Sequence, residues 1–399
     1  MPKLLRAPIG RYLVLAQPGK HRLFVLNPLA AWIWEAQAAG WNEQAMAKAL
    51  ARRFGKPDAE TLEDVHKTCR WLAMECREAM PAADPVEAAP GLKTATPAPG
   101  TSDLVNGNES HPRSVAAPPP NGYPAVASVT PETLPPHSPN DQTWRLSIAD
   151  TSVDLRIDHP GLASAAGALV EPLSTWRSGP RAHTLRLAGP PNAWSLHADG
   201  AWRGEGTGLD EALVALVSAL MDLGADSANR LLVVHGAGLA MPDGRGLLLI
   251  APGGSGKTTL AAALNAESHG LLNDDVVPVT PDGRLVALGT PICLKAGSWP
   301  VLSELRPDLA KTAGMRRHGQ TVRFLPPRGP RVTRPVPTGL LLFPRYLPGS
   351  APVAEALTPE AVLRGVIEAD AVIRDLTQEK LEGIVRWVQI GRASCRERV

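Results

Sequence analysis

The stretch Gly246–Leu264, GLLLIAPGGSGKTTLAAAL, decides the fold of the larger part of this chain. Its first five residues are an apolar run typical of a buried strand, and a glycine-rich turn follows them directly. The segment that begins at Lys257 predicts a helix, because small and apolar residues continue without a breaker. A strand, a glycine-rich loop and a helix in this order form the local unit that binds phosphate groups in α/β domains. We therefore predict an α/β fold that binds a nucleotide at this loop.

Each position of the loop suits that chemistry. The glycines let backbone N–H groups approach phosphate oxygens without a Cβ clash, and the helix N-terminus adds partial positive charge. Lys257 would reach the β- and γ-phosphates of ATP, and the Thr258 hydroxyl would be a ligand of Mg²⁺. The loop departs from the usual pattern at Ala251, where that pattern has a glycine. The predicted nucleotide-binding residues are Gly253, Gly254, Ser255, Gly256, Lys257, Thr258 and Thr259.

Two adjacent acids follow the next apolar strand, in the stretch Gly270–Val277, GLLNDDVV. One helix and one short strand separate them from the loop, so a compact βαβ unit would place Asp274 and Asp275 beside the phosphates. Adjacent carboxylates can divide the work, one holding Mg²⁺ and the other accepting a proton from an attacking hydroxyl. The alternative is a solvated acidic turn before Pro278.

A histidine precedes the loop on a neighbouring strand. The run Leu231–Gly238, LLVVHGAG, predicts a strand that ends at His235, and the tight Asp243-Gly244 turn would bring it next to the strand that enters the loop. His235 would then lie near the γ-phosphate. The alternative is a purely structural histidine.

Taken together, these three stretches and their spacing resemble the HPr kinase/phosphorylase family, and especially the kinases related to it. The resemblance covers most of residues 144–389 and implies an HPr kinase/PEP carboxykinase-like core that phosphorylates a protein serine with ATP or pyrophosphate. It implies that Asp274 is the general base, that His235 assists proton handling and that Asp275 is the second acid near the metal. Arg316, Arg317 and Arg323 would lie in a mobile loop.

Residues 144–210 predict a small β-rich lobe on this core. Polar and apolar residues alternate there as in strands, and Asp199-Gly200 suits a hairpin turn.

The first 80 residues predict a separate α+β module of winged-helix type. Strands are expected at Arg11–Leu15 and Arg22–Leu26. Asn27 followed by Pro28 predicts a helix start, and further helices are expected from Asn42 and Asp58. Trp32, Trp34 and Trp41 are expected in the core.

The stretch Val25–Gly55, VLNPLAAWIWEAQAAGWNEQAMAKALARRFG, resembles the PqqD family, whose members are also called RiPP recognition elements. The resemblance implies binding of the leader of a ribosomally made precursor peptide, which adds as a strand to the sheet edge and lies against the third helix. The binding surface would be Leu23–Leu26 and the exposed face of Thr61–Arg70. The alternative is a winged helix for domain contacts or DNA, in which the basic residues Lys48, Arg52 and Arg53 would matter more.

Composition separates these modules. The expected domains are residues 1–80, which the resemblance to PqqD makes the peptide-binding domain; 81–140, a disordered or semi-extended Pro-rich linker; and 141–389, which the resemblance to the HPr kinase family makes the kinase domain. The last ten residues, Ile390–Val399 (IGRASCRERV), resemble a translated sequencing adapter, and we therefore expect them to be a non-native tail. The alternative is a genuine basic tail.

The overall composition excludes several classes of protein. The 399 residues carry 41 Lys and Arg against 39 Asp and Glu, a net charge of +2, which argues against a nucleic-acid partner. No apolar run reaches the roughly 20 residues of a membrane span, and the N-terminus lacks a signal-peptide pattern. We therefore expect no membrane partner. The four cysteines form no C-x-x-C pair, which favours reduced thiols and a cytoplasmic protein.

The predicted function is an ATP- and Mg²⁺-dependent serine/threonine kinase that acts on a precursor peptide or small protein, with the N-terminal domain binding the leader. The alternative is a non-catalytic nucleotide-binding adaptor or scaffold in peptide or polysaccharide biosynthesis. Whether the chain forms a homo-oligomer is left open. A transporter-type ATPase is disfavoured, because the chain has no LSGGQ-like signature.

Overall fold

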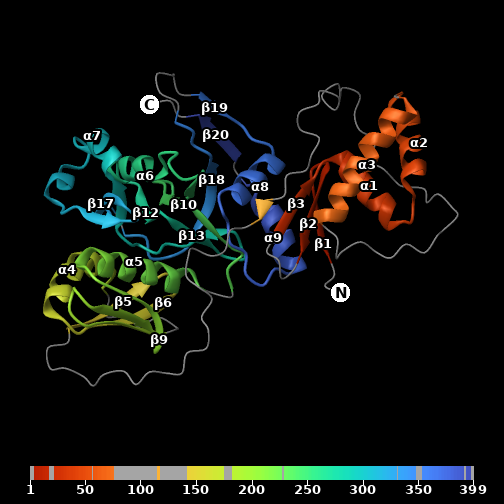
Figure 1. Ribbon diagram of the computed structural model, residues 1–399. Helices are drawn as coiled ribbons and strands as arrows, with labels where there is room; N and C mark the ends of the chain where they lie inside the picture. Colours follow the sequence, from red (N-terminus) through yellow and green to blue (C-terminus); the bar gives the residue numbers. More distant parts are fainter. Residues whose placement is uncertain are drawn as a thin grey trace. The chain divides into compact units, whose positions relative to one another are not determined.

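The computed structural model describes residues 4–17, 22–55, 57–75, 115–116, 142–174, 182–226, 229–329, 331–346, 353–390 and 392–396. The protein is of mixed α/β type, with several sheets and helices (Figure 1). Its contacts divide it into two units, which we treat separately: Met1–Ala117 with Asp375–Val385, and Pro118–Arg374 with Arg386–Val399. Most of the predicted linker, 81–140, lies outside the described residues.

Unit 1 combines an antiparallel sheet with helices, the α+β type that the sequence predicts, and it includes most of the helix Gln378–Trp387 from the C-terminal part of the chain. The sheet order is β1-β2-β3-β4, and β4 comes from the predicted linker. The elements are β1 (Leu5–Ile9), β2 (Tyr12–Gln17), β3 (Arg22–Leu26), α1 (Pro28–Ala38), α2 (Glu43–Phe54), α3 (Asp58–Glu75) and β4 (Val115–Ala116).

Side-chain caps fix where the first helices of unit 1 begin. Asn27 Oδ1 accepts a hydrogen bond of 2.8 Å from the Ala30 amide, and Asn42 Oδ1 accepts one of 2.8 Å from Ala45. These bonds satisfy amides that have no partner within the helix, so both predicted helix starts are confirmed. Gly55 ends α2 with a φ of 64°, a left-handed conformation that glycine adopts without strain.

The three tryptophans of α1 and its C-terminal turn lie in or against the core of unit 1, as expected. Trp34 is buried, and Trp32 and Trp41 pack edge to face with their ring centroids 5.8 Å apart. The sequence did not predict β1, the strand that forms one edge of the sheet.

In unit 2, a five-stranded sheet carries two helices on one face (Figure 1). Only β6 and β7 run parallel in it, and the chain between them includes α4. Asp199 and Gly200, with φ of 51° and 77°, form the turn of the predicted hairpin. The elements are β5 (Gln142–Ile148), β6 (Thr151–Ile157), α4 (Pro160–Val170), β7 (Ala182–Ala188), β8 (Trp194–Ala198), β9 (Ala201–Gly206) and α5 (Leu209–Ala225).

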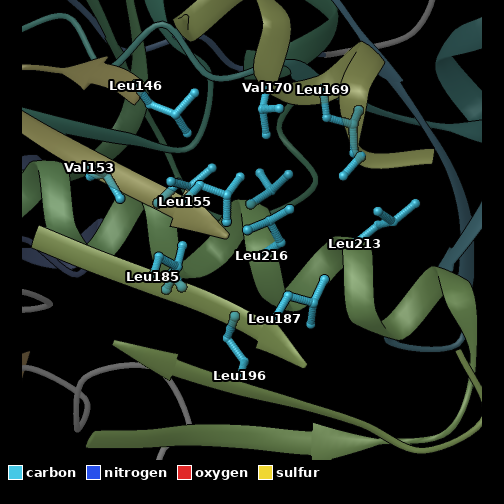
Figure 2. Packing of buried hydrophobic residues seen from close by; sticks show 14 of the residues in the cluster. Leu146, Val153, Leu155, Leu169, Val170, Leu185, Leu187, Leu196, Leu213 and Leu216 are labelled. Carbon is cyan, nitrogen blue, oxygen red and sulfur yellow. The ribbon is translucent and has the colours of Figure 1, made fainter. Parts of the chain in front are cut away.

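Figure 2 shows the core between this sheet and its helices, where leucines of the strands meet leucines of α4 and α5. Leu155 of β6 is 1% exposed and lies among Leu185, Leu213 and Leu216. The same cluster includes Phe324, which belongs to a different sheet, so the β-rich part shares one core with the rest of unit 2.

Replacing Leu155 by Ala is expected to destabilise unit 2 by about 2–5 kcal/mol, because the close-packed neighbours cannot fill the cavity. Denaturant unfolding, followed by a signal from unit 2, measures the loss. Leu209→Ala is the matched control, since Leu209 is 38% exposed and should cost less than about 1 kcal/mol. Equal losses in the two variants would contradict this assignment of the core.

The remaining strands of unit 2 form an eight-stranded and a three-stranded sheet. In the larger sheet, β11 lies beside β10 and also pairs in parallel with β18. Its strands are β10 (Leu232–Ala240), β11 (Gly246–Ile250), β12 (Gly270–Asn273), β13 (Val276–Val279), β14 (Arg284–Leu285), β18 (Val336–Leu342), β19 (Val353–Glu355) and β20 (Arg392–Arg396). The smaller sheet contains β15 (Ile292–Lys295), β16 (Met315–Arg317) and β17 (Gln320–Leu325).

The other helices of the chain are mostly short. They are α6 (Lys257–Ala266), α7 (Trp299–Leu302), α8 (Pro359–Glu368) and α9 (Gln378–Trp387), with 3₁₀ segments at Glu171–Leu173, Ala296–Ser298 and Pro307–Lys311. No helix in the part of the chain that the structure describes is both long and apolar enough for a membrane span. The C-terminal strand β20 pairs with β18 and β19, and the non-native origin of the tail stays a prediction.

Candidate functional site

Strand register brings the glycine-rich loop, the histidine and the two acids to one level of the large sheet. Gly236 of β10 pairs with Ile250, the last residue of β11 before the loop. On the other side of β10, His235 pairs with Val276, the first residue of β13. Two strand spacings, about 10 Å, therefore separate the start of the loop from the acids that precede β13.

His235 lies within β10 and does not end it, because the strand continues to Ala240. The expectation of a strand end was therefore wrong. Gly236 serves close packing there: a Cβ on it would lie 2.5 Å from the Leu249 carbonyl oxygen of β11. Gly236 is therefore needed for the two strands to approach each other.

The predicted strand, loop and helix around the glycines are all present. Gly254 and Gly256 have φ of 82° and 90°, and a Cβ on Gly253, Gly254 or Gly256 would meet nothing within 4 Å. The backbone of the loop at the N-terminus of α6 is therefore not crowded by other atoms, and a ligand could approach it. The Ser255 Oγ atom is buried and has no hydrogen-bond partner in the described parts of the chain. Open backbone, an unused hydroxyl and a helix N-terminus are features that suit a phosphate group.

Lys257 is buried beneath this loop, with 7% of its surface exposed. Its Nζ donates to the carbonyl oxygens of Ala251 and, at 3.1 Å, Pro252. Burial and the nearby Lys295 lower the pKa of Lys257, while Asp275 opposes that shift. The surroundings therefore balance the positive charge of Lys257 only in part, and an anion bound in the loop would be attracted to it.

The two threonines that follow Lys257 differ in their contacts. Thr259 Oγ1 lies 2.7 Å from Ser298 Oγ, so this hydroxyl is engaged in a hydrogen bond within the protein. Thr258 is half-buried in the first turn of α6, next to the loop.

Asp275 is the acid that faces the other charged groups of the site. His235 Nδ1 lies 3.6 Å from Asp275 Oδ1, and Arg317 Nη2 donates to Asp275 Oδ2 at 3.1 Å. The same carboxylate acts electrostatically on Lys257. The structure thus gathers His235, Asp275 and Lys257 from the predicted set, and adds Arg317.

Asp274 lies in a more enclosed position and is 4% exposed. Its Oδ2 accepts a hydrogen bond of 2.8 Å from the Cys293 amide. Burial, and then the charge of Asp275, raise the pKa of Asp274 to about 7. A small cavity borders both acids, and its walls are largely apolar side chains, among them Val217 and Met221 of α5. This carboxyl group can therefore carry or release a proton near neutral pH.

The three arginines expected in a mobile loop lie instead on a β-hairpin, in strands β16 and β17. The sequence signal that could have suggested this hairpin is the alternation of polar and apolar residues beside the turn at His318 and Gly319, where φ is 47° and 76°. Each arginine has a different partner. Arg317 contacts Asp275, and the Arg316 amide donates to Asp210 Oδ2 at 2.8 Å. The Arg323 guanidinium lies 3.9 Å from the centroid of the Trp299 ring.

Among the residues that the structure describes, no group of three or more His, Cys, Asp and Glu side chains could hold a metal ion. Mg²⁺ is commonly held by one or two protein ligands together with substrate phosphates, so it does not need such a group. The Asp275 carboxylate and the Thr258 hydroxyl suit this hard cation, since both offer oxygen.

The predicted leader-binding surface in unit 1 has an apolar strand and a charged helix face. Leu23–Leu26 are all buried in the sheet, and β4 pairs with the edge of β3. On α3, Lys67 Nζ lies 2.7 Å from Glu63 Oε1, and His66 Nδ1 lies 2.7 Å from Glu43 Oε2 of α2.

The basic residues of the DNA-binding alternative, Lys48, Arg52 and Arg53, are exposed on α2.

Comparison with known families identifies part of unit 1. Residues 12–76 match the family model of PqqD, coenzyme PQQ synthesis protein D. The class that this segment defines is the RiPP recognition element, and the segment is a PqqD-like domain of that class. The matched range begins with β2 and ends just after α3. A search of curated proteins finds no match to the chain.

Proposed function

We propose that this chain is an ATP-dependent kinase that phosphorylates a serine or threonine of a ribosomally made precursor peptide. The observation that carries the proposal is the convergence of the glycine-rich loop, Lys257, His235 and the acid pair on one level of a sheet, in a chain with a PqqD-like domain. The domain would hold the leader, and the second unit would act on a residue farther along the same peptide.

The loop supports binding of a nucleoside triphosphate. The amides around Gly254 and Gly256 and the N-terminus of α6 would surround the β- and γ-phosphates, and Lys257 would leave its loop carbonyls to contact them. Asp275 and Thr258 would hold Mg²⁺, which neutralises charge on these phosphates when bound.

The acid pair supports transfer to a hydroxyl. The acceptor oxygen would form a bond to the γ-phosphorus while the bond from that phosphorus to the β,γ-bridging oxygen breaks, and ADP would leave. Asp274, with a pKa of about 7, would take the hydroxyl proton, and His235 would stabilise the charge of Asp275. Arg317 would keep the Asp275 carboxylate in place through their hydrogen bond of 3.1 Å.

Holding the leader and the acceptor on one peptide gives an advantage that neither contact has alone. Once the leader is bound, the acceptor meets the second unit as a tethered group, at an effective concentration set by the connecting chain. The leader and the acceptor can therefore each bind weakly, and transfer would still occur.

The direct test is incubation of the full chain with ATP, Mg²⁺ and any short precursor peptide whose gene adjoins its own. Mass spectrometry should show the addition of one phosphate to the peptide, and a peptide without its leader should react far more slowly. ATP binding without ADP formation or peptide modification would overturn the kinase proposal and support the nucleotide-binding adaptor.

A further inference from the structure

The sheet of unit 1 has two edges, and the chain itself occupies both. At the β1 edge, Gln378 Nε2 donates to the Arg6 carbonyl oxygen at 2.8 Å, and the Arg6 amide donates to Gln378 Oε1 at 3.4 Å. One side chain thus satisfies both backbone groups of a residue on that edge, as a neighbouring strand would. At the other edge, β4 pairs antiparallel with β3, Ala116 opposite Arg22 and Val115 opposite Leu23.

The sequence around β4 limits how strongly it can pair. Pro112 precedes it and Pro118–Pro120 follow it, and proline has no N–H to donate to a strand ladder. An uninterrupted ladder is therefore confined to the few residues between these prolines, and the structure shows two residue pairs. A peptide with a longer proline-free extended segment could form more pairs along Arg22–Leu26 than β4 does.

From this pairing we infer that Val115–Ala116 is an internal substitute for the leader: it covers the strand-docking edge of β3 and must be displaced when a leader binds. The partner that this surface fits is an extended peptide, longer than β4 and free of proline over the docked residues. Because β4 belongs to the same chain, its competition does not weaken on dilution. The role of the leader as competitor rests on the proposed function, whereas the covering of β3 by β4 does not.

Amide hydrogen exchange in the full chain tests the covering of β3 without any ligand. Val115→Pro combined with Ala116→Pro removes both N–H groups of β4 and should break its pairing, so amide exchange at the paired residues Arg22 and Leu23 should become roughly tenfold faster. The matched control is Val126→Pro combined with Ala127→Pro, which changes an identical dipeptide in the same Pro-rich stretch and should leave β3 exchange as it was. Equal β3 exchange in both variants and the unaltered chain would overturn the inference.

A peptide in trans gives the second readout. The synthetic heptapeptide HPRSVAA, residues 111–117, should restore slow β3 exchange in the Val115→Pro/Ala116→Pro variant at millimolar concentration. The precursor peptide should bind that variant several-fold more tightly than it binds the unaltered chain. Equal affinity for both would show that β4 does not compete and would overturn the inference. Failure of the precursor to bind either protein, with the exchange difference intact, would instead count against the proposed function alone.

Discussion

Replacing Lys257 by Met is expected to lower the rate of phosphoryl transfer by at least about 1,000-fold. The structure places this ammonium group beneath the loop, and in the proposed reaction charge would develop on the γ-phosphoryl group. A methionine has a similar length and no charge, so it fills the space without contacting phosphate. Initial rates of peptide phosphorylation, measured by mass spectrometry at saturating ATP, give the size of the loss.

The fold should survive this substitution. Lys257 Nζ bonds to carbonyl oxygens of its own loop, and one of these belongs to Pro252, which is exposed and can bond to water. The pKa of Lys257 is lowered by burial, so its charge is held there at a cost that methionine avoids. The control is Lys311→Met, which removes an exposed lysine of the same unit and should change neither rate nor stability. If Lys257→Met kept more than about a tenth of the activity, the loop would not be the phosphate site.

The parts of the fold that sequence could predict are those with a local cause. Asn27 and Asn42 act through hydrogen bonds three residues along the chain, and Asp199-Gly200 forms its turn by local backbone preference. The strand before the loop and the helix after it also follow from local patterns.

The elements that the sequence missed depend on their neighbours. The strand β1 contains Pro8, which argues against a strand, yet an edge position tolerates it because one side of the strand needs no ladder donor. The helix α4 contains four alanines, which favour a helix, but also Gly161 and Gly167, which lower its helix propensity. It is stabilised by burying Leu162 and Leu169 in the shared core, and Pro160 at its first turn was the local signal that could have revealed it.

The site shows the same division between local and long-range causes. Residue types and order suggested the loop, the acid pair and the histidine. Strand register across β10 decides that His235 lies beside Asp275, and only tertiary packing brings Arg317 of the β16–β17 hairpin to the same carboxylate. The unequal burial of Asp274 and Asp275 also depends on α5, which is remote in sequence from both.

Replacing Asp274 by Asn is expected to lower phosphoryl transfer by about 100- to 10,000-fold while ATP binding is retained, because the amide cannot accept the hydroxyl proton. Asn has the same shape, and its Oδ1 can accept the hydrogen bond that the Cys293 amide now donates to Asp274. Isothermal titration with ATP and Mg²⁺ should therefore give an affinity within a few-fold of the unaltered chain.

The same substitution should make stability less dependent on pH. Burial raises the pKa of Asp274 to about 7 from an ordinary value of 3.8, so the folded chain binds a proton that the unfolded chain has released. The unaltered chain therefore loses stability as pH rises from about 4 to about 7, and the loss is complete above the folded pKa. Asn does not titrate, so the Asp274→Asn chain should be more stable by about 1–4 kcal/mol at pH 8, with the advantage vanishing below pH 4.

A second carboxyl group with a raised pKa provides a control for the role of Asp274 in transfer. Asp222 has an exposed position on α5, where partial desolvation raises its pKa to about 6, and it takes no part in the hydrogen bonds and ion pairs described above for Lys257, His235 and Arg317. Because water screens this exposed group, Asp222→Asn should gain much less stability at high pH than Asp274→Asn, and it should keep full transfer activity. Unfolding midpoints from pH 4 to pH 8 and peptide phosphorylation rates, measured on both variants, make the comparison. If Asp222→Asn lost as much activity as Asp274→Asn, or if Asp274→Asn stayed active, proton transfer to Asp274 would be excluded as the source of catalysis.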